Sequence, residues 1–187
     1  MHKSKFTVQK IAYIAVLAAI VCVVTFFRFP LLGSKVHLAN AMCLMSGLLL
    51  GGIPGGLAAG IGSALYDALY GGYDLIQVAI TFVSKFLMAW VCAAIAFSGG
   101  SQAKSHGKNI AASIIGALTY VALYMLKTFV YQRFIYGYPM DAVWITMGSK
   151  LPGSLINALA AMVVAPILYS ALSAALQRAH LLDKMRK

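Results

Sequence analysis

Charged and aromatic side chains interrupt stretches of the chain that are otherwise apolar. Asp67, Lys85 and Lys127 fall inside such stretches, where an unpaired charge costs at least about 2.5–3.5 kcal/mol at the centre of a membrane helix. Three tyrosines and a lysine recur at intervals of four, three and four residues: Tyr120, Tyr124, Lys127 and Tyr131. This spacing places them on one helical face, which should look into protein, where it could hold a polar ligand. An Asp–Lys pair, or snorkelling of the lysines, would equally explain the charges.

Two polar connections add further candidate binding groups. The stretch 28–40 contains His37 and turn-forming residues, and the stretch 132–149 contains tyrosines and Trp144. We expect the first to be a loop over an outward-facing pocket. A lone histidine is more often a hydrogen-bonded structural group than a ligand contact.

The composition indicates an all-α integral membrane protein. Of 187 residues, 61% are hydrophobic and only 10% are charged, whereas a soluble domain has roughly 25% charged residues. Apolar segments are predicted at 8–29, 36–52, 54–71, 75–98, 109–135 and 149–177. We therefore expect a single membrane domain over 1–187, built as a bundle of six transmembrane helices.

Basic residues set the expected orientation. Nine lysines and arginines lie in the two termini and the 99–108 connection, and far fewer lie in the other connections. Positive residues favour the cytoplasmic side, so both termini should be cytoplasmic. The net charge of +11 is thus explained by membrane topology, and no nucleic-acid partner is expected.

Enzyme and metal motifs are missing from the sequence. It has no Walker loop, no His-Glu-x-x-His and no Gly-x-Ser-x-Gly, and it contains four carboxylates in all. Three isolated cysteines lack the spacing of a metal site or a disulfide framework. We expect no catalytic residue, no bound metal and no bound cofactor.

Several blocks together resemble the substrate-binding S component of an energy-coupling factor (ECF) transporter, a class of bacterial and archaeal vitamin importers. The blocks are AVLAA at 15–19, VHLANAMCLMSGLLLGGIPGGLAAGIGSALYDALYGGY at 36–73, FVSKFLMAW at 82–90 and PGSLINALAAMVVAPIL at 152–168. The resemblance covers nearly the whole chain. It implies a multi-pass cell-membrane subunit that binds a vitamin and works with a transmembrane coupling protein and two ABC-type ATPases, which would use the ATP.

The resemblance also implies roles for individual residues. Ala15 and Ala19 match the first-helix contact to the coupling protein. Binding groups in this class come from the outer loops and the later helices, which here offers Lys85, Tyr124, Lys127, Tyr131, Trp144, Lys150 and Asn157, together with His37 and Asn40.

The ligand and the mode of transport stay open at this level. The 36–90 pattern is nearest to the branch for pyridoxine and hydroxymethylpyrimidine-like precursors. Three amines in or beside the bundle could instead meet a carboxylated vitamin such as pantothenate or folate, unless Asp67 and Asp74 neutralise them. A self-standing small-solute transporter is the remaining alternative, although no internal repeat supports it.

Overall fold

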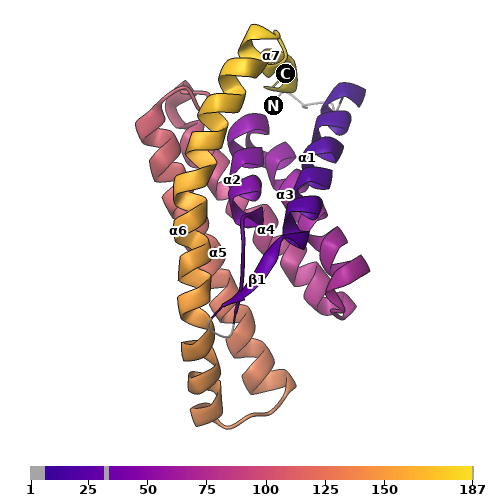
Figure 1. The fold of residues 1–187 in the computed structure, drawn as a ribbon, viewed down its shortest axis with the longest axis vertical. Coiled ribbons are helices and arrows are strands. Elements are labelled where there is room, and N and C mark those ends of the chain that lie inside the picture. The colour runs from indigo at the N-terminus through magenta and orange to yellow at the C-terminus, as the bar shows by residue number, and fades with distance from the viewer. Residues whose placement is uncertain (1–6, 32–33, 187) are drawn as a thin grey trace.

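The computed structural model describes residues 7–31 and 34–186 as a helical bundle with one small β-hairpin (Figure 1). All six predicted segments contain a helix. The elements are α1 (Val8–Phe26), β1 (Arg28–Leu31), β2 (Ser34–His37), α2 (Ala39–Leu50), α3 (Gly52–Tyr66), α4 (Leu75–Ala96), α5 (His106–Val130), α6 (Met140–Arg178) and α7 (Leu182–Arg186). The seventh helix was not predicted.

The first and second helices are joined by a β-hairpin rather than by the irregular loop predicted for 28–40. β1 pairs antiparallel with β2, and Arg28 lies opposite His37. The prediction that 28–29 and 36–38 are helical was therefore wrong. Pro30 can occupy an edge strand because its missing N–H is not needed there.

Glycine allows α2, α3 and α1 to pack closely. Gly51, with φ of 74°, separates α2 from α3, so the reversal needs one residue and α3 starts earlier than predicted. A Cβ at Gly62 would lie 2.3 Å from the carbonyl oxygen of Ala18. Gly56 and Gly60 face Phe86 and Phe82 of α4 at similarly short range. Close helix packing at small residues is thus observed in α3.

The last long helix starts much earlier than the sequence indicated. α6 runs through 140–149 with Pro152 and Pro166 in its interior, whereas the prediction began the helix at 149 and made 132–149 a loop. Proline within a membrane helix is tolerated when neighbouring helices support the backbone. Near the same end, α5 continues into a π-helical turn at Tyr131–Ile135.

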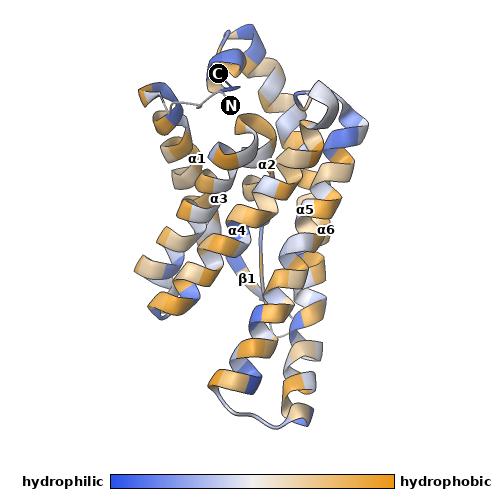
Figure 2. Cartoon of the chain, turned by 180° about the vertical axis from the view of Figure 1, so that it is seen from behind, coloured by the Kyte–Doolittle hydropathy of each residue, from blue (hydrophilic) through white to orange (hydrophobic). Residues whose placement is uncertain are grey.

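Apolar side chains cover the outside of the bundle. Along α6, Leu159, Val163 and Ile167 are each about 60% exposed, and Figure 2 shows hydrophobic colour along most of the helix lengths. Four helices, α1, α4, α5 with its extension, and α6, are long and apolar enough to cross a membrane. α2 and α3 are shorter, so six crossings with cytoplasmic termini stays a prediction.

The start of α1 and the short helix α7 lie at the same end of the bundle (Figure 1). Arg186 of α7 donates to the carbonyls of Leu48 and Leu49 at 3.3 Å and to the Tyr169 hydroxyl at 2.8 Å. These carbonyls end α2, where a helix is most in need of donors and of positive charge. α7 thereby ties α2 to α6.

Candidate functional site

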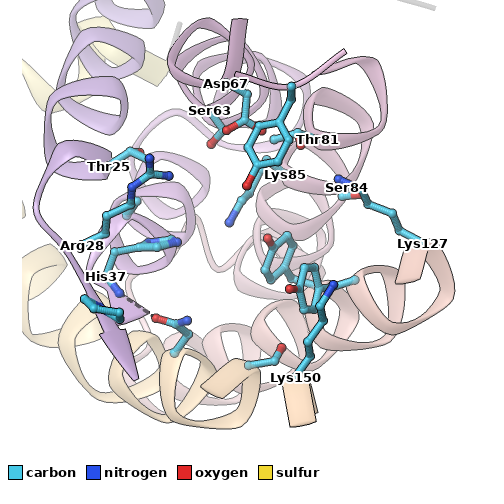
Figure 3. Close-up of a pocket in the computed structure, with 17 residues that line it drawn as sticks. Thr25, Arg28, His37, Ser63, Asp67, Thr81, Ser84, Lys85, Lys127 and Lys150 are labelled. Atoms are coloured by element: carbon cyan, nitrogen blue, oxygen red, sulfur yellow. Dashed lines mark hydrogen bonds between the residues drawn. The ribbon is translucent and has the colours of Figure 1, made fainter. Parts of the chain in front are cut away.

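A cavity of about 440 Å³ opens between the hairpin and the helices α3–α6 (Figure 3). Its wall is polar and carries several charges. The lining residues are Thr25, Arg28, Pro30, His37, Ala39, Ser63, Asp67, Tyr73, Thr81, Ser84, Lys85, Tyr120, Tyr124, Lys127, Lys150, Ser154 and Asn157. The volume is within the roughly 300–1,000 Å³ typical of small-molecule sites.

Lys85 lies on the floor of the cavity, on α4. It is 4% exposed, its Nζ donates to Oδ1 of Asn40, and the same Nζ is 3.6 Å from the centroid of the Tyr120 ring. An amide oxygen and an aromatic face both stabilise a buried ammonium. Lys85 lines the cavity. Asn40 is not among the lining residues and contacts the lysine instead.

The predicted polar face of α5 lines the cavity over most of its length. Tyr120 and Tyr124 stack with ring centroids 6.2 Å apart and planes 24° apart, and Lys127 follows them on the wall. Tyr131 is buried but is not in the wall. Its ring lies 5.8 Å from the Lys127 Nζ, so it contacts the lysine rather than the cavity.

The hairpin is fastened to α6 in the wall of the cavity. The backbone N–H of His37 donates to Oδ1 of Asn157 at 2.8 Å, a bond drawn as a dashed line in Figure 3. Burial, helped by the charges of Lys85 and Arg28, lowers the pKa of His37 to about 3, so the imidazole is neutral at physiological pH. Its Nδ1 is buried and has no hydrogen-bond partner among the described residues.

Asp67 joins the cavity wall from the π-helical turn Asp67–Gly71 that continues α3. Within residues 7–31 and 34–186, no ion pair within 4 Å joins it to Lys85 or Lys127. The Asp–Lys pair considered from the sequence is therefore not formed. The lysines are stabilised by tyrosine rings instead, since Lys127 also lies 5.5 Å from the Tyr73 ring.

Other predicted residues divide between the cavity and the surface. Lys150 and Asn157 of α6 line the cavity. Trp144 does not line the cavity. Its side chain is 58% exposed and lies near Phe129 on the outside of the bundle. The segment 140–149 is helical and is not the loop that was predicted to contribute Trp144 to the site.

Sequence reasoning left several lining residues out of the candidate site. Several are hydroxyl residues next to, or one helical turn before, a predicted or charged residue: Thr81 and Ser84 before Lys85, Ser63 before Asp67, and Ser154 before Asn157. Arg28, Thr25 and Tyr120 are also in the wall. The spacing of three or four residues was a usable signal for the hydroxyls. Among the described residues, no cluster of three or more His, Cys, Asp or Glu side chains could hold a metal.

Comparison with known proteins gives two findings and one negative result. Residues 5–174 match the family "ECF-type riboflavin transporter, S component". The chain belongs to this family. A solved structure of the S component of a bacterial ECF transporter has a TM-score of 0.70 at 19% identity, over 90% of this chain and 97% of that one, which shows the same fold. A search of curated proteins gave no match.

Membership in the ECF S-component family confirms the resemblance found in the sequence and has direct consequences. The chain is a transport binding subunit and not an enzyme, and it is a multi-pass protein of the cell membrane. The family implies coupling and ATPase partners and a vitamin ligand. The vitamin in the family's description is riboflavin, whereas the sequence pattern had pointed to pyridoxine or hydroxymethylpyrimidine-like compounds.

For this S component, the predicted docking alanines lie on the outer surface. Ala15 and Ala19 of α1 are exposed, while Ala18 is buried and its carbonyl oxygen lies against Gly62 of α3. Ala15 and Ala19 are therefore available to a partner helix, and small residues are what close helix contacts in membranes use. Their role in docking stays a prediction.

Proposed function

We propose that this chain captures riboflavin from outside the cell and presents it to an ECF-type importer. The observation that carries the proposal is the family match over residues 5–174. The vitamin would bind in the cavity described above, with the hairpin β1–β2 over it. Transport would require a coupling protein docked on α1 and separate ATPase subunits.

The chemistry of the cavity suits a flavin. Riboflavin has a flat, polar ring system and a chain rich in hydroxyl groups. The stacked rings of Tyr120 and Tyr124 offer a surface on which a flat ring can pack. Hydroxyl side chains, including Thr25, Thr81 and Ser84, can exchange hydrogen bonds with the hydroxyl chain.

Fluorescence titration of the purified protein tests the proposal. Flavin fluorescence should be quenched on binding, with saturation at one ligand per protein, and pyridoxine should not compete. Tyr124→Leu should weaken binding by about 2- to 13-fold or more, because ring stacking is worth about 0.5–1.5 kcal/mol beyond burial. The matched control is Tyr138→Leu, since Tyr138 is 49% exposed and outside the cavity wall.

Two results would contradict riboflavin as the ligand. One is saturable binding of pyridoxine or pantothenate by a protein that does not quench flavin fluorescence. The other is equal loss of affinity in Tyr124→Leu and Tyr138→Leu. Co-expression tests the transport role: an S component should purify with a membrane protein and ATPases, whereas a self-standing transporter would move riboflavin in vesicles without them.

A further inference from the structure

Positive charge exceeds negative charge around the cavity. The described part of the wall contains four cationic side chains, Arg28, Lys85, Lys127 and Lys150, and a single carboxylate, Asp67. His37 adds no charge because it is neutral. A cavity within a membrane protein is a low-dielectric environment, where unbalanced charge is unfavourable and an ion of opposite sign is strongly attracted.

Aromatic rings contact three of these cations, Arg28, Lys85 and Lys127, without neutralising them. Arg28 lies 4.8 Å from the Tyr66 ring centroid, and Lys127 lies between the rings of Tyr73 and Tyr131. Cation–π contacts are worth about 0.5–2 kcal/mol, but they leave the positive charge and the N–H donors in place. The carboxylate of Asp74 is committed elsewhere, since it accepts from the backbone and side-chain nitrogens of Gln77 at 2.8 Å.

Lys127 and Lys150 are the cations best placed to meet a ligand. They come from α5 and α6, both line the cavity, and each is partly exposed. Lys150 has no hydrogen bond or ion pair among the described residues. Figure 3 shows Lys150 on the opposite side of the cavity from Asp67. Lys85, by contrast, is buried and already donates to Asn40.

We propose that Lys127 and Lys150 form a binding site for an anionic group, a phosphate monoester or a carboxylate, on the vitamin that enters this cavity. This inference rests on the proposed function in taking the cavity as the vitamin site. With riboflavin as the parent compound, the anionic ligand is its phosphate monoester. A paired ammonium–phosphate contact is charge-assisted and is about twice as strong as a neutral hydrogen bond.

The test compares riboflavin with its phosphate monoester on the purified full-length protein. The wild type should bind the phosphate monoester at least about 10-fold more tightly, because a hydrogen bond to a charged group contributes enough for about 10- to 150-fold. Lys127→Met with Lys150→Met should abolish this advantage, so that riboflavin and its phosphate monoester bind the double variant with similar affinity. Lys127→Arg with Lys150→Arg should retain it. Lys104→Met is the matched control, because Lys104 is exposed and outside the wall.

Three outcomes separate this inference from the proposed function. If riboflavin binds but its phosphate monoester gains nothing, or the double Met variant keeps the gain, the phosphate site is overturned and riboflavin stands. If neither flavin binds but pantothenate does, and only while the two lysines are present, the anion site stands with a carboxylate ligand and riboflavin is wrong. If no anionic compound depends on the two lysines, the inference fails.

Discussion

The hydrogen bond between Asn157 and the hairpin should control how fast the ligand leaves the cavity. His37 donates from its backbone nitrogen to Oδ1 of Asn157 at 2.8 Å, and this bond joins β2 to α6 in the cavity wall. Asn157→Leu removes the acceptor at nearly constant size. The hairpin would then open more easily, so riboflavin should dissociate faster.

The size of the effect follows from the geometry of this contact. A neutral hydrogen bond of good length contributes about 0.5–1.5 kcal/mol net, which corresponds to about a 2- to 13-fold increase in the dissociation constant. Because Asn157 is only 6% exposed, no water replaces the bond readily. Most of the change should appear in the dissociation rate, as is usual for changes within one binding site.

Stopped-flow fluorescence measures this rate. The riboflavin-loaded protein is mixed with an excess of a non-fluorescent competitor, and the rise in flavin fluorescence follows the release of riboflavin. Asn157→Asp is the matched control, since a carboxylate keeps an acceptor oxygen for the His37 N–H. Its dissociation rate should stay near the wild-type value. Equal acceleration in both variants would show that the amide group contacts the ligand itself, and an unchanged rate in Asn157→Leu would refute the coupling between hairpin and release.

Further predictions concern the docking surface, the α7 contacts and the topology. Replacing both Ala15 and Ala19 with leucine should lower riboflavin uptake by cells far more than it lowers the riboflavin affinity of the purified protein. The larger side chains would keep a helix of the coupling protein from approaching α1 closely. Equal losses of uptake and affinity would mean that the alanines stabilise the bundle. Arg186→Met should destabilise the protein by about 1.5–3 kcal/mol and leave ligand affinity unchanged. Its melting temperature should be lower than that of the control variant Lys184→Met. Equal melting temperatures in the two variants would contradict the role of Arg186. The 99–108 connection should be cytoplasmic. A single cysteine replacing Ser105 in an otherwise cysteine-free variant should therefore react with a membrane-impermeant reagent only after the cells are permeabilised. Labelling in intact cells would show the opposite orientation.

The helices could be predicted because hydrophobicity over long stretches is a strong signal. Every predicted apolar segment contains a helix, and the predicted break between 52 and 54 lies close to the observed junction at Gly51. The charged and aromatic face of α5 was also visible, because Tyr120, Tyr124 and Lys127 have helical spacing and all line the cavity. These features depend on local sequence alone.

The boundaries on the hairpin side could not be predicted in the same way. The last apolar segment was predicted to begin at 149, but α6 begins at Met140 and continues through Pro152. The strands β1 and β2 are four residues each, too short for alternation to identify them. Their position depends on the distant contact with Asn157.

Partners of the buried charges were the least predictable feature, and the reason is geometric. From the sequence, Asp67 was the obvious counter-ion for Lys85 and Lys127, since opposite charges in a membrane should pair. The π-helical turn that begins at Asp67 instead leaves this carboxylate in the cavity wall, while Asn40, Tyr120 and Tyr73 meet the lysines. Neutral partners hold a cation in place without cancelling its charge. The cavity thus keeps the positive charge that attracts an anionic ligand and that a structural ion pair would have removed.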